Sequence, residues 1–200
     1  MLDADLFRAE CRMGPTGRFA FVFVIVASVF MLPTHAFALS AENLLVAVPS
    51  GYTVGHQAHN ARQLISEMVP TAETVDTWTE MVTVLIYFGQ KGSLIGYRSK
   101  MEKDWAAACA GAKSAPVGGG LVNGYTTMTW RQTCPLNKAT GKPEITWFKA
   151  IAGNDSFYVV QKAFKFEPSP EQAKAWAAWL DKVSVCDTRL PERKCPAGMR

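Results

Sequence analysis

Two histidines, His56 and His59, come closest to a metal-binding pattern in this sequence. Side chains three residues apart share one face of a helix, so an H-x-x-H pair on a helix could bind one zinc ion together. The pattern around these histidines predicts a turn, however, and the nearest acidic residue is Glu67. Because no carboxylate or cysteine is close enough in sequence to complete a ligand set, we expect solvent-exposed histidines, no metal and no cofactor.

Residues that could perform hydrolysis are present, but they follow no recognisable catalytic pattern. Ser50-Gly51 lacks the G-x-S-x-G motif that presents a nucleophilic serine on a sharp turn. The acidic residues that follow it have no spacing that points to a catalytic pair of carboxylates; they are Glu67, Glu73, Asp76 and Glu80. We therefore expect no catalytic residues here, although an enzyme with a site assembled from distant positions stays open.

Three consecutive glycines, Gly118-Gly119-Gly120, form the one glycine-rich stretch. Exposed backbone N–H groups of such a stretch could cradle an anion. A phosphate-binding loop would continue into Gly-Lys-Ser/Thr and a helix, and neither follows here. The triplet therefore predicts a mobile loop.

The tryptophans indicate a core with two exceptions. Trp105 and Trp176 fall on apolar helix stripes, and Trp130 and Trp147 fall on strands, so we expect them to be buried. Trp179 lies about 100° from the centre of its apolar stripe. Together with Trp78, it is the best candidate for an exposed aromatic contact. His56 and His59 complete the candidate residues for contact with a ligand or partner.

Four cysteines follow residue 38, at positions Cys109, Cys134, Cys186 and Cys195. An even number of cysteines in an exported chain is typical of structural disulfides, and four cysteines allow three pairings. We favour Cys186–Cys195, which closes a short C-terminal loop, and Cys109–Cys134, which ties a helix end to a strand end. A zinc site or a redox pair fits less well, because there is no C-x-x-C motif.

The first 38 residues have the three parts of a secretory signal peptide. Arg8, Arg12 and Arg18 precede the uncharged run 19–32, and the small-residue triplet Ala36-Phe37-Ala38 follows. Fourteen residues rise about 21 Å as a helix, less than the ~30 Å hydrocarbon core of a bilayer. We expect cleavage after residue 38 and export to the periplasm of a Gram-negative cell. An uncleaved signal anchor is the alternative, and Met13 could be the true start.

Composition places the remaining chain among ordinary globular domains. The chain has 200 residues, 48% hydrophobic and 19% charged, with a net charge of +4. The signal segment carries equal numbers of basic and acidic residues, so this charge belongs to residues 39–200. It is too small to indicate nucleic-acid binding. We expect residues 39–200 to form one exported domain that is monomeric and lacks a transmembrane span.

Strand and helix patterns alternate along this domain. β-branched and aromatic runs with turn signals between them predict strands at 44–48, 53–57, 63–69 and 82–88, with one helical turn at 74–78. Apolar residues at steps of three and four predict an amphipathic helix from Ser93 to about Gly111.

Three strands and a second helix follow in the second half. Strands are predicted at 125–134, 144–152 and 157–166. Ser169-Pro170-Glu171-Gln172 then has the pattern of a capping box at the start of a second amphipathic helix. Short turns between strands imply antiparallel pairing, so we expect an α+β fold: a mostly antiparallel sheet of six or seven strands covered by two helices.

Several stretches resemble a family of uncharacterised exported proteins from alphaproteobacteria. They are residues 69–70 (VP), 78–83 (WTEMVT), 134–137 (CPLN), 140–144 (TGKPE), 153–158 (GNDSFY), 186–189 (CDTR) and 195–196 (CP). The resemblance covers most of 42–196 and implies export and paired cysteines, but no activity. The element order is also similar to the Mog1/PsbP-like α/β/α sandwich, whose members are mostly accessory or binding proteins.

These observations favour a non-catalytic periplasmic accessory or binding protein over an enzyme. Its partner would be an envelope protein or a small ligand. The alternative is a small exported hydrolase-like enzyme whose site the sequence does not reveal.

Overall fold

The structure, a computed structural model, describes residues 41–196. The predicted signal peptide, residues 1–38, lies outside this range. In chain order the elements are β1 (Glu42–Leu45), β2 (Tyr52–His59), β3 (Gln63–Pro70), β4 (Glu80–Phe88), α1 (Leu94–Ala108), β5 (Lys113–Val122), β6 (Tyr125–Asn137), β7 (Lys142–Ala152), β8 (Ser156–Phe164), α2 (Pro170–Lys182), β9 (Ser184–Asp187) and the 3-10 helix η1 (Pro191–Arg193). Neither helix of this range is long and apolar enough to cross a membrane.

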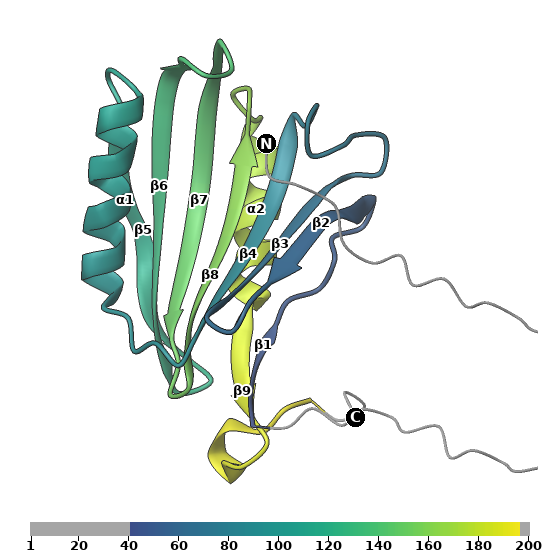
Figure 1. The fold of residues 1–200 in the computed structure, drawn as a ribbon, viewed down its shortest axis with the longest axis vertical. Helices are drawn as coiled ribbons and strands as arrows, with labels where there is room; N and C mark the ends of the chain where they lie inside the picture. The colour runs from purple at the N-terminus through teal and green to yellow at the C-terminus, as the bar shows by residue number, and fades with distance from the viewer. Residues whose placement is uncertain (1–40, 197–200) are drawn as a thin grey trace, which may run out of the picture. The chain divides into compact units, whose positions relative to one another are not determined.

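Seven strands form one antiparallel sheet in the order β2-β3-β4-β8-β7-β6-β5 (Figure 1). β2 and β5 are its edge strands. β1 and β9, from the two ends of the domain, pair antiparallel in a second, two-stranded sheet. The predicted α+β class is therefore confirmed.

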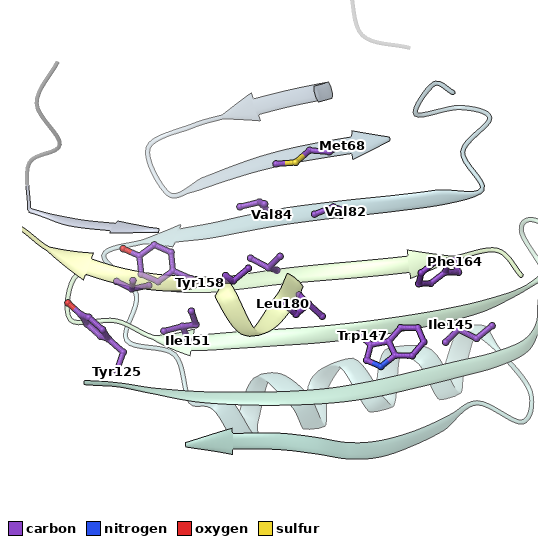
Figure 2. Packing of buried hydrophobic residues seen from close by; sticks show 13 residues of the cluster. Met68, Val82, Val84, Tyr125, Ile145, Trp147, Ile151, Tyr158, Phe164 and Leu180 are labelled. Carbon is purple, nitrogen blue, oxygen red and sulfur yellow. The ribbon is translucent and has the colours of Figure 1, made fainter. Parts of the chain in front are cut away.

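The two helices cover opposite faces of the large sheet. On one face, Tyr97 and other residues of α1 pack against a cluster containing Phe148. On the other face, Leu180 of α2 packs against a cluster containing Trp147 (Figure 2). Adjacent strand residues point to opposite sides of a sheet, so Trp147 and Phe148 mark the two faces. We refer to them as the α2 face and the α1 face.

Both helices begin at serine caps, of which the sequence predicts the one at Ser169. Ser93 accepts a hydrogen bond from the backbone N–H of Gly96 at 3.1 Å. Ser169 and Gln172 form the predicted capping box of α2, with proline at its first turn. These bonds satisfy backbone donors that have no partner within a helix, and they set where each helix starts.

The glycine triplet is not a loop, contrary to the sequence prediction. Gly118, Gly119 and Gly120 belong to edge strand β5, which pairs with β6. The register shifts between Pro116 and Gly118, and an edge strand can hold a proline at such an irregularity because only one side of the strand must pair. A Cβ on Gly119 would lie 2.9 Å from the carbonyl oxygen of Thr127, so glycine permits the close approach of the two backbones.

Two other local predictions were wrong. Residues 74–78 form a turn, with Thr77 N–H donating to the Thr74 carbonyl at 3.2 Å, and no helix. The first strand spans Glu42–Leu45 and ends before most of the predicted run 44–48. Its partner β9 was not predicted, because a four-residue strand gains its pairing only from a segment more than 130 residues away, and local pattern cannot show that.

The four cysteines form the two disulfides favoured from the sequence. Cys109–Cys134 joins the residue after α1 to β6, with the two Cα atoms 5.8 Å apart. Cys186–Cys195 joins β9 to the segment after η1, with the Cα atoms 4.9 Å apart. The first bond anchors the end of the α1 helix on the sheet, and the second anchors the C-terminal segment on the small sheet.

Candidate functional site

The tryptophans chosen from the sequence lie at separate places and are both half-buried. Trp78 lies in the turn before β4, and the Lys165 ammonium stands 3.7 Å from its ring centroid. Trp179 packs edge-on against Trp176 at 5.5 Å. It also lines a groove of about 580 Å³ between α2 and residues 44–50. Each ring thus has a partner within the protein on at least one side.

The histidines are strand residues rather than turn residues. Both belong to β2 and both are exposed. The register of β2 against β3 shifts at a bulge between Val54 and His56. After this bulge the pairing is continuous, with His56 opposite Glu67 and His59 opposite Leu64. Because alternate positions of a strand point to opposite faces, His56 and His59 cannot share one metal ion. No group of three His, Cys, Asp or Glu in the described range is arranged to hold a metal.

Another candidate site lies where the α1 face meets the ends of β3 and β4. Two adjoining recesses of about 470 and 360 Å³ share Tyr87 and Gln90 in their walls. We call them together the α1-end recess. The first lobe lies beside the β2–β3 turn and the second beside the first turns of α1. The side chains used below come from Asn60, Arg62 and Gln63 in the first lobe and from Tyr97, Lys100 and Phe157 in the second.

Aromatic rings line the recess from β4, α1 and β8. The ring centroids of Tyr97 and Phe157 are 5.4 Å apart, and Tyr87 lies 6.2 Å from Tyr97 and 6.3 Å from Phe157. Tyr97 also contacts the buried Trp130 at 6.2 Å, so the recess wall continues into the core under α1. Packing of this kind holds rings in fixed orientations. The wall is therefore preformed.

Glycine shapes the second lobe. A Cβ on Gly92 would lie 2.5 Å from Cδ2 of Phe157, closer than real contacts allow. The absence of a side chain at Gly92 lets the segment before α1 run directly over the Phe157 ring. Any larger residue there would displace this ring. A substitution at Gly92 would therefore change the shape of the second lobe without removing any of its polar side chains.

Polar groups of the first lobe are held by the β2–β3 turn. The Asn60 side-chain oxygen accepts hydrogen bonds from the backbone N–H groups of Arg62 and Gln63, at 2.8 and 3.0 Å. This arrangement fixes the Asn60 amide. Gln63 is the register partner of Tyr87, so the first lobe is built from neighbouring side chains of β3 and β4.

The phenol of Tyr97 stays protonated at neutral pH. Burial raises the pKa of Tyr97, and the neighbouring Tyr87 raises it further. Tyr97 therefore offers a neutral hydroxyl group in the second lobe rather than a phenolate.

The charged groups of the recess are basic. Arg62 and Lys100 line the first and second lobe, and none of the described residues that line either lobe is acidic. Lys100 forms an exposed ion pair with Asp104 at 2.6 Å, one helical turn further along α1. Exposed pairs of this kind are worth at most about 1 kcal/mol. The Lys100 charge is therefore available to a ligand at small cost.

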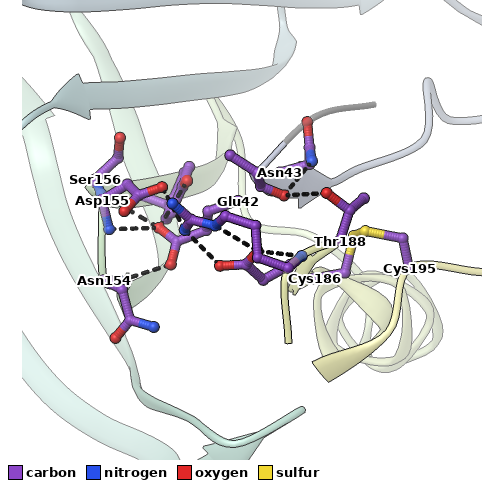
Figure 3. A network of polar contacts seen from close by, with 12 residues as sticks. Glu42, Asn43, Asn154, Asp155, Ser156, Cys186, Thr188 and Cys195 are labelled. Carbon is purple, nitrogen blue, oxygen red and sulfur yellow. Dashed lines mark hydrogen bonds and ion pairs between the residues drawn. A yellow bond between two sulfur atoms is a disulfide. The ribbon is translucent and has the colours of Figure 1, made fainter. Parts of the chain in front are cut away.

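Contacts behind the recess hold its far side in place. The Glu42 carboxylate accepts hydrogen bonds from the backbone N–H groups of Asn154, Asp155 and Ser156 at 2.6, 3.1 and 3.2 Å (Figure 3). This turn leads into β8 and Phe157. The carbonyl of Asp155 in turn accepts from Gly89 N–H at 3.0 Å, next to Gln90. The small sheet thereby supports two parts of the recess wall.

The α2 face holds a buried cation, Lys162, which has no exposed surface. Its ammonium donates to Tyr52 Oη at 2.6 Å and Glu80 Oε2 at 2.7 Å. It also lies 3.8 Å from the ring centroid of Trp176 and 4.3 Å from that of Phe164. Burial lowers the pKa of Lys162 from 10.5 to about 8, although Glu80 opposes the shift. Such a lysine is chemically suited to proton transfer, but solvent and substrate do not reach it.

A second buried lysine closes the C-terminal end of α2. Lys149 is 3% exposed and donates to the carbonyls of Leu180 and Asp181 at 2.8 and 3.2 Å. A cation at a helix C-terminus compensates the partial negative charge there. Burial lowers the pKa of Lys149, and Asp181 opposes that shift. Lys149 therefore stabilises the packing of the C-terminal end of α2 against β7.

The comparisons with known proteins show no family for this chain. No protein-family model matches it, and no curated protein matches it. Among solved structures it is similar to the Ran-binding protein Mog1p of Saccharomyces cerevisiae, with a TM-score of 0.41 and 14% identity. The match covers 71% of this chain and 84% of that one. This likeness is weak and carries no functional statement, and the resemblance to exported alphaproteobacterial proteins gains no support from it.

The sequence analysis did not identify any residue of the α1-end recess as functional. The recess combines one turn, the ends of two strands and a helix start, which only the sheet order brings together. A partial signal was present: Asn60 follows His59 in a polar turn, and Tyr87 and Gln90 flank the end of a strongly predicted strand.

Proposed function

We propose that this chain is a non-catalytic binding protein of the bacterial envelope, exported to the periplasm, and that the α1-end recess is its ligand site. The observation that carries the proposal is the recess itself: two lobes with a shared wall, fixed aromatic rings and amide side chains. Preformed concave sites with a few oriented polar groups are the usual form of small-molecule binding sites. The two disulfides fit an oxidising compartment.

A ligand panel tests this proposal. Purified domain, residues 39–200, is mixed with envelope-type compounds such as amino acids, oligosaccharides and short peptides. Binding is followed by two-dimensional NMR, and each compound is recovered afterwards for mass spectrometry. We expect shifts at Gln63, Tyr87 and Tyr97 with at least one compound, and we expect the recovered compound to be unchanged.

A matched variant makes the test specific to the recess. Gly92→Ala should displace Phe157 and weaken binding, whereas Gly118→Ala, whose added Cβ meets nothing within 4 Å, should leave it unchanged. Shifts centred on Trp78, Trp179, His56 or His59 would instead place the ligand contact at the residues expected from the sequence. Shifts nowhere in the domain would contradict the proposal.

The alternative, a small exported hydrolase-like enzyme, draws support from Lys162. Its lowered pKa and its bonds to Tyr52 and Glu80 are features found in acid–base groups. An enzyme of this kind requires a conformation in which Lys162 is reached. Chemical change of any panel compound that is lost in Lys162→Met would favour it over the binding protein.

A further inference from the structure

We infer that the α1-end recess binds an extended saccharide that carries carboxylate groups. This inference rests on the proposed function, since it names the ligand class of the same site. It is argued from the shape of the recess, its hydrogen-bonding groups and its charge.

The shape suits a ligand that spans both lobes. The lobes are joined across Tyr87 and Gln90, so a molecule that fills both must cross these two side chains. Tyr87 is half-buried and Gln90 is exposed. A chain of linked rings, with one ring in each lobe and the linkage at Tyr87, matches this arrangement better than a single compact molecule does.

The aromatic and amide groups fit sugar rings. The C–H face of a sugar packs on aromatic rings, and Tyr87 and Tyr97 offer such rings in the wall. Asparagine and glutamine amides each carry donors beside an acceptor. Neighbouring hydroxyl groups of a sugar can bind both at once. Asn60, Gln63 and Gln90 supply three amides, and the Asn60 amide retains both of its N–H donors because its oxygen takes the turn bonds.

The charge favours an acidic saccharide. Arg62 lies in one lobe and Lys100 in the other, so each ring of the ligand meets one cation. Arginine forms bidentate hydrogen bonds with carboxylates. The Lys100–Asp104 pair is exposed, with side chains 67% and 50% accessible, and Lys100 can exchange this partner for a ligand carboxylate.

An extended acidic peptide fits less well. Peptides commonly bind by adding a strand to a sheet edge. The recess is lined by the β2–β3 turn and by the ends of the internal strands β3 and β4, and none of its described lining residues belongs to the edge strands β2 or β5. A peptide in the recess would therefore lack the backbone ladder that gives such complexes their affinity.

The test uses two oligosaccharides that differ only at C6. Cellotetraose is the neutral probe, and the β-1,4-linked tetramer of glucuronic acid is the acidic probe. Binding to the domain is measured by calorimetry at low salt and by NMR. We expect the acidic tetramer to bind at least about tenfold more tightly, with shifts in both lobes. We expect Arg62→Gln to lower its affinity about tenfold and to leave the neutral tetramer little changed.

Controls separate this inference from the proposed function. Lys138→Gln, a charge removal in the β6–β7 turn, should leave both affinities unchanged. Equal binding of the two tetramers would overturn the acidic class, and equally tight binding of tetraglutamate would overturn the saccharide. Failure of both tetramers to bind would overturn the inference altogether. The proposed function would still stand if another panel compound shifted the recess residues, and it would fall with the inference only if none did.

Discussion

The two faces of the large sheet are each covered by one helix, but they differ in how completely their polar groups are paired and their strands are covered. On the α2 face, α2 lies over the sheet, and the buried cations Lys162 and Lys149 find partners within the protein. On the α1 face, α1 packs mainly against β6 with fewer contacts to β5 and β7, and the ends of β3 and β4 remain open. Buried charges are tolerated only where partners and hydrogen bonds are complete. The paired charges of the α2 face therefore serve stability, and the α1 face leaves the ends of β3 and β4 open. The α2 face also has recesses at its margins, one of about 580 Å³ along residues 44–50 and one of about 420 Å³ beside Lys149.

Buried polar atoms sharpen this contrast. Tyr125 Oη, Trp130 Nε1, Gln132 Oε1 and Thr146 Oγ1 are buried and have no hydrogen-bond partner among the described residues, and Tyr125 belongs to the α2-face cluster. Trp130 belongs to the α1-face cluster, and the alternation of side chains along β6 and β7 puts Gln132 and Thr146 on that face too. An unpartnered buried group costs about 1–3 kcal/mol. Three of these four atoms lie on the α1 face and one lies on the α2 face, so the α1 face bears more of this cost.

The largest expected effect comes from breaking the charge cluster of the α2 face. Lys162→Ala should lower the free energy of unfolding by about 3–5 kcal/mol, because it leaves Glu80 beside a cavity without its cation. Urea denaturation followed by tryptophan fluorescence measures this. Lys162→Met combined with Glu80→Gln should cost clearly less, and Lys100→Met, at an exposed pair, should cost under about 1 kcal/mol. A loss for Lys162→Ala as small as that for Lys100→Met would remove the contrast between the faces.

The next largest effects are expected from removal of the two disulfides, of which Cys109–Cys134 anchors α1 and Cys186–Cys195 anchors the small sheet. In the chain-entropy relation, the Cys109–Cys134 bond contributes about 3.5 kcal/mol and the shorter Cys186–Cys195 loop about 2.6 kcal/mol. Replacing each pair by serines should lower stability in that order. Hydrogen exchange should then rise at the end of α1 for the first variant and at β1 and β9 for the second. Faster exchange of α2 in the first variant would show that the faces are not independent.

A smaller effect is expected at the C-terminus of α2. Lys149→Met removes the cation that donates to Leu180 and Asp181 carbonyls, and we expect a loss of about 2 kcal/mol. Amide exchange should increase in the last turn of α2 and little elsewhere. Lys113→Met, an exposed lysine at the start of β5, is the matched control. Unchanged exchange in α2 would mean that Lys149 does not hold this helix end.

The last effect is a pH dependence carried by Lys162, which amounts to about 2 kcal/mol between pH 8 and 10 and is similar in size to the loss expected for Lys149→Met. Its pKa is 10.5 in ordinary surroundings and about 8 in the folded chain, so between these values the unfolded chain holds a proton that the folded chain has released. Stability from this group therefore rises with pH from about 8, by at most about 1.4 kcal/mol per pH unit. Burial and Glu80 raise the pKa of Tyr52, which reverses the trend above about pH 10, where unfolded tyrosine ionises. Chemical denaturation between pH 8 and 10 should show the rise in the wild type and a clearly smaller one in Lys162→Met, where Lys149, whose pKa burial also lowers, still contributes.

Much of the fold could be predicted because its signals are local. The capping box at Ser169, the apolar stripe of α2 and the alternating residues of β6 each act within a few neighbouring positions. The cysteine pairing followed from loop length and from the expected ends of α1 and β6. Glycines 118–120 were misassigned because strand formation there depends on the partner β6, whose Thr127 carbonyl approaches Gly119.

The candidate site could not be predicted from the sequence either, because it depends on contacts between segments that are far apart in the chain. His56 and His59 attract attention by their spacing, but the strand geometry of β2 turns them to opposite faces. Arg62, Tyr87 and Lys100 have no spacing that relates them, and they line one recess only because β3, β4 and α1 meet at one end of the sheet.

The sequence alone determined the α+β class, the two helices and the cap of α2, and it favoured the disulfide pairing that the structure shows, because each depends on periodicity, local hydrogen bonds or loop length. Only the tertiary structure decided which strands are edges, which lysines are buried among partners and where the sheet stays open. Those properties arise from contacts between segments far apart in the chain, and no short stretch of sequence encodes them.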